Sequence, residues 1–160
     1  ESATMWRDSW VKALDQWEDR WPEAFRVSNN SGRGILITGT NDWKDYTVSS
    51  KIRFELVKSG GLAARVQGLQ RYYALEVSSG NKLRLIKMLD GLHILKEIDT
   101  EMVFQKDYDL SLKVDGSNLK GYLDDKLVLE FDDLDNTLTN GGIGFVVESG
   151  TQSTNEIIIS

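Results

Sequence analysis

The sequence predicts an all-β protein whose antiparallel strands form a two-sheet sandwich. From Leu62 onward, short segments alternate apolar and polar residues, a period that puts one side of a strand in a core and the other in water. Acidic pairs separate several of these segments, and such pairs supply the positive φ that two-residue hairpin loops require. The pairs are Asp90-Gly91, Asp115-Gly116 and Asp124-Asp125.

Composition sets limits on the domain count and on the partners. A chain of 160 residues with 40% hydrophobic content suits one domain, over residues 1–160. The excess of 25 acidic over 19 basic side chains argues against a nucleic-acid partner. The absence of cysteine excludes disulfides, thiolate nucleophiles and cysteine-based metal sites. No membrane span or signal peptide is predicted, and the compartment stays open. Because the chain begins at Glu1, we expect a fragment of a larger protein.

The N-terminal segment, residues 1–23, is rich in tryptophan. All five tryptophans lie in the first 43 residues, and the four before Pro22 fit one face of a helix: Trp6, Trp10, Trp17 and Trp21. The alternative is irregular chain with a strand over the edge of the sandwich, in which the indoles seal the core. Either way we expect this segment to pack on the sandwich.

The clearest strand is 46–56, where five polar residues alternate with an apolar set and predict one solvated face. Before it, 25–27 and 35–37 are expected strands, separated by a turn at Asn29–Gly32. A break is expected at Lys58–Gly61, and Lys87 obscures which face of its strand is buried. The remaining expected strands are 62–67, 72–77, 82–89, 92–98, 108–114, 119–123, 127–131, 143–147 and 156–159.

A set of polar residues lies opposite the apolar positions of these strands. If the strands are neighbours, the side chains share a surface suited to a polyhydroxylated ligand, because Arg donates from a planar fork, carboxylates accept from hydroxyls and Tyr stacks on a sugar. The alternative is an ordinary solvated face with cross-strand ion pairs. The candidate ligand residues are Arg65, Gln67, Tyr72, Glu76, Arg84 and Glu148.

An acidic stretch, Glu130–Asp135, suggests a different chemistry. Two carboxylates about 5–5.5 Å apart on one strand face can perform retaining glycoside hydrolysis. The stretch resembles the E-x-D-x-x-E strand of family 16 glycoside hydrolases, but Asp135 replaces the last Glu. A solvated turn after Phe131 is the favoured interpretation, so we expect no catalytic residue in this chain.

Metal binding has weaker support. Asp132, Asp133, Asp135 and Glu156 offer oxygen donors for a structural calcium ion, but their spacing forms no loop motif, and no cofactor is expected otherwise. The only histidine, His93, is expected at the surface rather than in a zinc site or a catalytic triad.

Several motifs resemble the concanavalin A/laminin-G-like jelly roll, and within it the sandwich modules of the family 66 carbohydrate-binding type. They include Gly61–Gln67, Tyr72–Leu75, Lys82–Lys87, Gly121–Leu127 and Gly141–Val147. A narrower set is similar to the C-terminal module of bacterial ADP-ribosylglycohydrolase-family proteins: Trp17, Trp21-Pro22, Phe25-Arg26, Gly32-Arg33-Gly34, Trp43, Asp45-Tyr46 and Ala63–Gly68.

The resemblance implies a non-catalytic accessory domain beside a hydrolase domain. The magnesium-binding catalytic positions of that hydrolase family have no counterpart here, whereas Arg65 and Glu148 fall where related sugar-binding sandwiches place polar ligand contacts. We therefore expect a glycan-binding module whose partners are a sugar and the catalytic domain of the same parent chain. The alternative is a structural docking domain that packs against that neighbour, and a β-sandwich glycoside hydrolase is the least favoured possibility.

Overall fold

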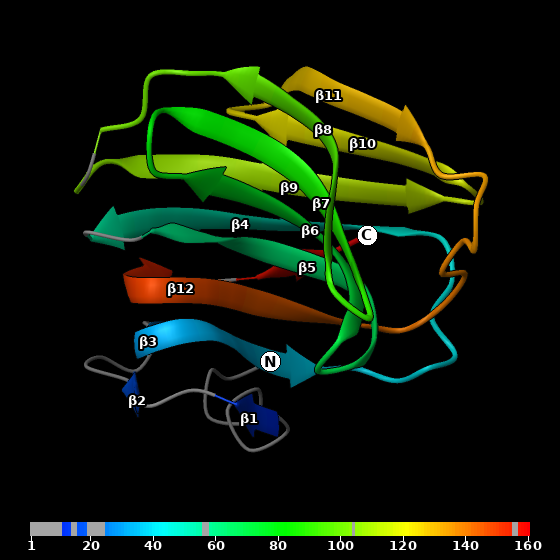
Figure 1. The fold of residues 1–160 in the computed structure, drawn as a ribbon, viewed down its shortest axis with the longest axis horizontal. Helices are drawn as coiled ribbons and strands as arrows, with labels where there is room; N and C mark the ends of the chain where they lie inside the picture. The colour runs from blue at the N-terminus through cyan, green and yellow to red at the C-terminus, as the bar shows by residue number, and fades with distance from the viewer. Residues whose placement is uncertain (1–10, 14–15, 19–24, 56–57, 104, 155–156) are drawn as a thin grey trace.

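The computed structural model describes residues 11–13, 16–18, 25–55, 58–103, 105–154 and 157–160. This part of the chain contains β-strands and no helix (Figure 1). The strands are β1 (Val11–Ala13), β2 (Gln16–Glu18), β3 (Phe25–Thr38), β4 (Tyr46–Glu55), β5 (Ser59–Gly68), β6 (Arg71–Ser78), β7 (Lys82–Leu89), β8 (Leu92–Asp99), β9 (Asp107–Asp115), β10 (Asn118–Leu123), β11 (Lys126–Asp132), β12 (Gly142–Thr154) and β13 (Ile158–Ile159).

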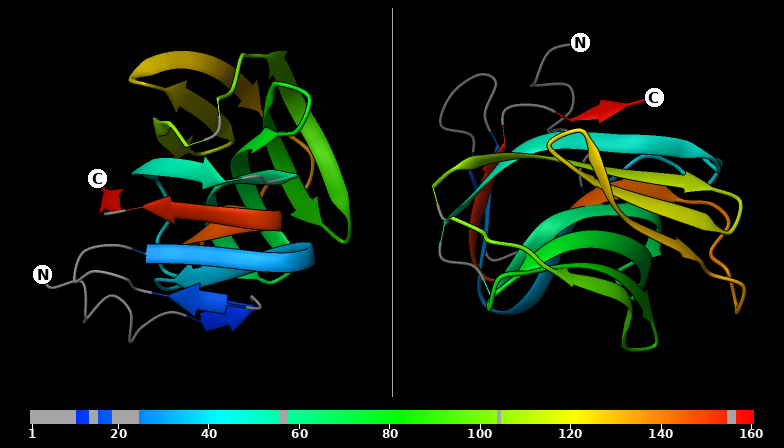
Figure 2. Two further views of the ribbon diagram at one scale, coloured as in Figure 1. Left: turned by 90° about the vertical axis from the view of Figure 1, so that its left-hand side faces the viewer. Right: turned by 90° about the horizontal axis from the view of Figure 1, so that it is seen from above.

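The strands form two antiparallel layers that face one another (Figure 2). The front sheet has the order β3-β12-β5-β6-β7-β8, and the back sheet has the order β4-β9-β10-β11, with β13 paired to β4. The end of β12 also pairs with β4, over 151–154 and 52–55, and this pairing joins the layers along one edge. The predicted two-sheet jelly-roll sandwich is confirmed.

The main core lies between the two sheets. Alternate residues of β4 point into it, with Val48 and Ile52 fully buried, as the period of two predicted. The facing strands contribute Leu62, Leu75 and Leu85 from the front sheet and matching leucines from β9. This layer of aliphatic and aromatic side chains holds the front sheet rigidly in place.

The outer face of the front sheet is apolar over much of its area. A second cluster of buried side chains occupies it: Ile35, Ala63, Val66, Tyr72, Ala74, Ile86, Met88 and Val146. Each belongs to β3, β5, β6, β7 or β12, so the cluster runs across the sheet. The charged residues of this face are therefore confined to one end of the strands.

The edge of the front sheet is extended by two short strands of the tryptophan-rich segment. Both β1 and β2 pair with β3, so a helix over this segment is wrong at 11–13 and 16–18, and strand over the edge is correct there. Trp6, Trp10 and Trp21 lie outside the described residues. The turn expected at Asn29–Gly32 is also wrong, because β3 continues through it with Gly32 at φ 72°.

Lys87 points into the sandwich, where buried oxygens neutralise it. Its Nζ lies 2.7 Å from Oδ2 of Asp133 and donates to the carbonyl oxygens of Asp135 and Asn136 at 2.7 and 2.8 Å. The Tyr73 hydroxyl donates to the same Asp133 oxygen at 2.5 Å and accepts from the amide of Leu138. This cluster fixes the β11–β12 loop against β6 and β7.

The acidic turns differ in their details. Asp124 and Asp125 both have positive φ, 49° and 65°, so this pair forms the hairpin loop without a glycine. The preceding hairpin, between β9 and β10, is shifted by one residue from its predicted position. Asp115 still pairs with Asn118, and Gly116-Ser117 forms the loop.

Candidate ligand-binding site

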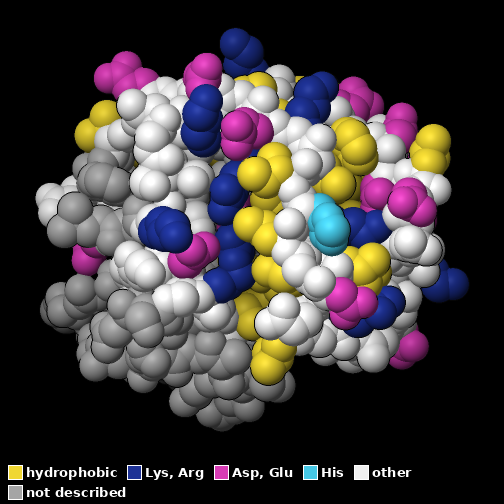
Figure 3. Space-filling view, viewed as in Figure 1, with side chains coloured by type: hydrophobic (Ala, Val, Ile, Leu, Met, Phe, Trp, Pro, Cys, Tyr) yellow, Lys and Arg dark blue, Asp and Glu magenta, His cyan; other side chains and the backbone are white. Residues whose placement is uncertain are grey.

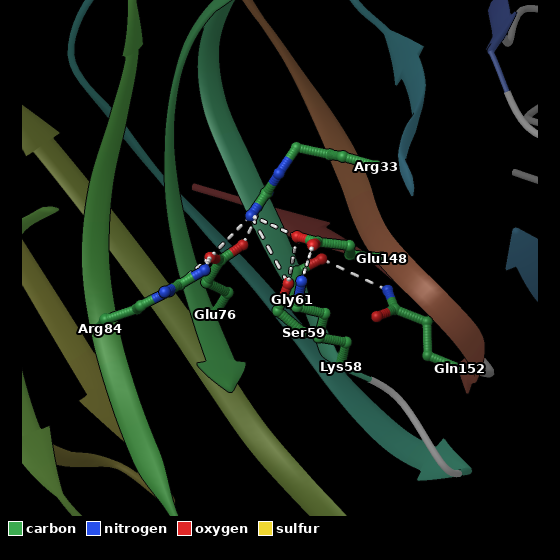
Figure 4. A network of polar contacts seen from close by, with 8 residues as sticks. All are labelled: Arg33, Lys58, Ser59, Gly61, Glu76, Arg84, Glu148 and Gln152. Carbon is green, nitrogen blue, oxygen red and sulfur yellow. Dashed lines mark hydrogen bonds and ion pairs between the residues drawn. The ribbon is translucent and has the colours of Figure 1, made fainter. Parts of the chain in front are cut away.

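A network of charged side chains occupies the end of the front sheet's outer face (Figure 4). At its centre, Glu76 of β6 accepts two hydrogen bonds from Arg33 of β3, from Nη1 at 2.8 Å and from Nη2 at 2.9 Å. Arg84 of β7 approaches Glu76 from the other side, with Nε and Nη2 both 2.7 Å from Oε1. One carboxylate therefore holds two guanidinium groups.

Strand register brings these side chains together. Arg33 lies opposite Glu148 of β12, which lies opposite Ser59 of β5. In the adjacent row, Glu76 lies between Gly61 of β5 and Arg84. Directly opposed residues of an antiparallel pair share one face, so two rows of polar side chains meet there.

Gly61 permits the close approach of β5 and β6 beneath the network. A Cβ at this position would lie 2.0 Å from the Leu75 carbonyl oxygen, a distance that no side chain tolerates. Because Gly61 carries no side chain and Ser59 carries a short one, β5 leaves room above it. The long side chain of Arg33 reaches across that room to Glu76.

Glu148 completes the network on the side of β12. Its Oε2 lies 3.4 Å from Nη2 of Arg33 and accepts from the Ser59 hydroxyl at 3.2 Å, while its Oε1 lies 3.1 Å from Nζ of Lys58. Burial opposes ionisation of this carboxyl. The hydrogen bond from Lys58, the charges of Arg33 and Lys58 and the Ser59 hydrogen bond outweigh burial and lower the pKa of Glu148.

The electrostatics of the network keep Arg33 charged. Burial disfavours the charged form of Arg33, but hydrogen bonds and the charge of Glu76 raise its pKa above the ordinary value. Tyr72 lies on the same face, and burial raises the pKa of its phenol, against the opposing charge and hydrogen bonding of Arg33. The Tyr72 hydroxyl therefore stays neutral.

Accessibility separates the network into a buried anchor and a surface. Glu76 is fully buried, whereas Arg33, Arg84 and Glu148 keep 15%, 14% and 17% of their side-chain surface exposed. The surface thus presents guanidinium donors beside one carboxylate acceptor. Figure 3 shows Lys and Arg side chains beside a band of hydrophobic side chains at the centre of the front face. This combination suits hydroxyl groups on a partly apolar ligand.

Four of the six predicted site residues are gathered here: Tyr72, Glu76, Arg84 and Glu148. Tyr72 is only 1% exposed, so its ring offers almost no surface for the stacking that was predicted. Three further members were not among the candidates: Arg33, Lys58 and Ser59. The alternation of Arg33, Ile35 and Ile37 could have placed Arg33 on this face, but the expected turn before it concealed the strand.

Arg65 lies elsewhere, because a bulge interrupts the alternation of β5. Its φ is 48°, and pairing with β6 shifts register between Ala64 and Gly68. The shift puts Val66 on the outer face with Ala63 and leaves Arg65 fully buried at the loop end of the sandwich. Its guanidinium donates to the carbonyl oxygens of Lys44, Gly116 and Leu138 and to Asp45 Oδ1, at 3.0, 2.5, 2.9 and 2.9 Å.

Gln67 also belongs to the loop end. Its Nε2 donates to the backbone carbonyl and side-chain oxygens of Asn140 at 3.0 and 3.3 Å, and its Oε1 accepts from Nε of Arg71 at 3.2 Å. Arg65 and Gln67 thus hold together the loops that follow β3, β9 and β11. The structure does not bring them to the charged network.

The acidic stretch forms separate local contacts. Glu130 and Asp132 each accept from Nδ2 of Asn118 at 3.0 Å, and Asp133 is buried against Lys87. Within the described residues, no group of three or more His, Asp or Glu side chains is arranged to hold a metal ion; Glu156 lies outside that part. His93 is exposed at the surface, as predicted. None of the described segments forms a helix that could cross a membrane.

Solved structures share this fold across almost the whole chain. A carbohydrate-binding module, CBM66, from Bacillus subtilis has 22% identity and a TM-score of 0.85, with 95% of each chain covered. A galectin-like protein of unknown function from the same organism has 13% identity and a TM-score of 0.73, covering 95% of this chain and 89% of its own. A putative glycosyl hydrolase from Parabacteroides distasonis has 8% identity and a TM-score of 0.71, covering 96% and 88%.

The sequence itself matches one family model. No curated protein matches the chain. The model of the galactocerebrosidase C-terminal lectin domain, however, matches residues 20–155, which include every residue of the charged network. The chain therefore belongs to the galactocerebrosidase C-terminal lectin domain family.

Proposed function

We propose that this domain binds a glycan through the charged network of Arg33, Lys58, Ser59, Glu76, Arg84 and Glu148. The observation that carries the proposal is the buried Glu76 carboxylate, which orients two partly exposed guanidinium groups beside the Glu148 carboxylate. The family is described as a lectin domain, and a module of the same fold is described as carbohydrate-binding. Both descriptions support a sugar as the ligand.

Recognition requires no chemical step. Rigid strands hold the donors and the acceptor in place before the ligand arrives, so binding orders few side chains. Sugar hydroxyls accept from Arg33 and Arg84 and donate to Glu148, which its lowered pKa keeps ionised near neutral pH. We therefore propose a non-catalytic module.

The proposed context is an accessory domain beside a glycohydrolase-type catalytic domain in one parent chain. The family description, a C-terminal domain of a galactocerebrosidase, supports such a neighbour. The resemblance to the module of ADP-ribosylglycohydrolase-family proteins names another possible parent and stays a prediction. No nucleic-acid or membrane partner is part of the proposal.

The test is a glycan array followed by calorimetric titration of the sugars that bind. Glu148→Gln keeps the shape of the side chain and removes its charge, and we expect it to weaken binding about tenfold or more. Asp107→Asn is the matched control, because Asp107 also pairs with an arginine, Arg53, but lies on the back sheet. Equal affinity of Glu148→Gln and the control would reject the site, and no binding by the unaltered domain would reject the function.

A docking role is the second candidate, and exposed leucine and isoleucine on the edge strand β8 favour it. Leu92 and Ile94 are 42% and 51% exposed on a strand whose outer edge has no backbone partner within the described residues. The proposed occupant is the neighbouring catalytic domain. Leu92→Ser with Ile94→Ser would then abolish co-purification of the two separated domains, and unchanged co-purification would count against docking through β8.

A further inference from the structure

The charged network contains a donor and an acceptor placed side by side. Nη2 of Arg33 and Oε2 of Glu148 come from directly opposed positions of β3 and β12 and lie 3.4 Å apart. That separation is long for a charge-assisted hydrogen bond, which is shorter, about 2.7–2.9 Å. The two groups are thus oriented toward each other without a strong bond, and both are partly exposed.

Glu76 fixes the position of the donor. Two of the Arg33 nitrogens are held by the Glu76 carboxylate at 2.8 and 2.9 Å, and Arg84 holds that carboxylate from the opposite side. Because Glu76 is fully buried, it cannot contact a ligand in this arrangement. Its effect on a ligand passes through Arg33 and Arg84, so Glu76 is a positioning residue.

The network and the register pairs next to it together carry no excess charge. The five charged residues in direct contact are three cations and two anions, Arg33, Lys58, Arg84, Glu76 and Glu148, a sum of +1. The next register pairs on the same face are Arg84 with Glu97 and Lys82 with Asp99, the latter an ion pair. They add one cation and two anions, so the network and these register pairs together hold four cations and four anions, a net charge of zero.

We propose, on the basis of the proposed function, that the site recognises a neutral sugar through one vicinal diol, which the Arg33–Glu148 pair contacts while Glu76 positions Arg33. A hydroxyl both donates and accepts, so two adjacent hydroxyls can satisfy Arg33 and Glu148 together. A sugar carboxylate only accepts, and it would face Glu148 and Glu97 in a domain whose chain has a net charge of −6. The ligand class is therefore a neutral sugar with free adjacent hydroxyls.

The experiment is calorimetric titration of the domain with methyl galactoside, methyl glucoside, fructose, galacturonate and glucuronate, at about 50 and 500 mM salt. At least one neutral sugar should bind about tenfold more tightly than the corresponding uronate, with an affinity that changes less than about twofold with salt. The deoxy analogue of that sugar, which lacks one of the adjacent hydroxyls, should bind about tenfold more weakly than the sugar itself.

Variants test the assigned roles. Glu76→Gln should lower the affinity for the neutral sugar and also reduce the ratio of that affinity to the affinity for the deoxy analogue, because Arg33 is no longer held. Arg53→Lys, on the back sheet, should change neither the affinity nor the ratio. Tighter binding of a uronate, or equal binding of the deoxy analogue, overturns the inference but leaves glycan binding intact. Binding of no sugar in the panel or on the array rejects the proposed function as well.

Discussion

Arg33 and Glu76 form a two-point ion pair across two intervening strands. Arg33 lies on β3 and Glu76 on β6, with β12 and β5 between them, yet their nitrogen–oxygen distances are 2.8 and 2.9 Å. The small residues of β5, Ser59 and Gly61, make this reach possible. The pair therefore ties together four of the five strands that carry the proposed ligand site, β3, β12, β5 and β6.

Removal of the Glu76 charge should destabilise the domain. Glu76→Gln leaves two guanidinium groups without their buried counter-ion, and breaking a buried pair in this way typically costs about 3–5 kcal/mol. We expect a lower midpoint in urea unfolding with an unchanged slope. Asp107→Asn, which breaks the exposed pair with Arg53, should cost less than about 1 kcal/mol. Equal effects of the two variants would contradict the assigned burial of Glu76.

Arg65 should contribute to stability and not to ligand affinity. Arg65→Met removes the donors of three backbone carbonyl oxygens, which belong to Lys44, Gly116 and Leu138. An unsatisfied buried acceptor costs about 1–3 kcal/mol, and because only the Leu138 oxygen is fully buried, a total loss of about 2 kcal/mol or more is expected from chemical denaturation.

The control for this variant is Arg71→Met, which alters an exposed arginine of the same loop end. It should leave the free energy of unfolding within about 0.5 kcal/mol. Under conditions where Arg65→Met is folded, its sugar affinity should equal that of the unaltered domain. If Arg65→Met is folded but no longer binds the sugar, Arg65 belongs to the ligand site after all.

Lys87 and Asp133 should show strong coupling. Each single change, Lys87→Met or Asp133→Asn, leaves one buried charge without its partner and should cost about 3–5 kcal/mol. The double variant removes both charges, so its loss of unfolding free energy should be well below the sum of the losses in the two single variants. Unfolding measurements on the four proteins give the coupling energy, and simple additivity would contradict a direct buried pair.

Tyr46 should make stability decline at high pH. Burial raises the pKa of its hydroxyl to about 12 from an ordinary value of 10.0, against the hydrogen bond from the Arg65 amide and the charge of Arg65. The folded state therefore binds the proton more tightly than the unfolded state. The Tyr46 contribution is complete below pH 10 and is lost as pH rises from 10 toward 12.

Tyr46→Phe isolates that contribution. The hydroxyl shares its one proton between the Gly141 and Gly142 carbonyl oxygens and accepts from the Arg65 amide, so the variant should be less stable by about 1–3 kcal/mol at neutral pH. The stability difference between Tyr46→Phe and the unaltered domain should shrink between pH 10 and 12. Thermal unfolding across that pH range measures this difference. A constant difference would show that Tyr46 does not titrate with the predicted shift.

The fold could be predicted because strand alternation and turn chemistry are local properties. The β4 pattern from Tyr46 to Phe54 and the hairpin loop at Asp124-Asp125 both depend on residues within a few positions. The bulge at Arg65 and the continuous β3 strand through Gly32 could not be predicted. Both depend on pairing with β12, far along the chain, since Gly142 pairs with Val66 beside the bulge and Glu148 pairs with Arg33 beside Gly32.

The site was predicted in part for the same reason. Glu76 and Arg84 lie on a hairpin, and alternation alone places them on one face. Arg33 and Glu148 join them through non-local register, and Glu148 was identified while Arg33 was not. The residue pattern of β7 did not show that Lys87 is buried. A lysine inside a core needs a buried carboxylate, which only the tertiary fold supplies.

A crystal structure of the domain with the neutral sugar that binds most tightly would show whether the charged network holds the ligand. We expect adjacent sugar hydroxyls within hydrogen-bonding distance of Arg33 and Glu148, with the Glu76 carboxylate still buried between the two arginines. A sugar bound instead at the loop end around Gln67 and Asn140, or on the back sheet, would contradict this expectation.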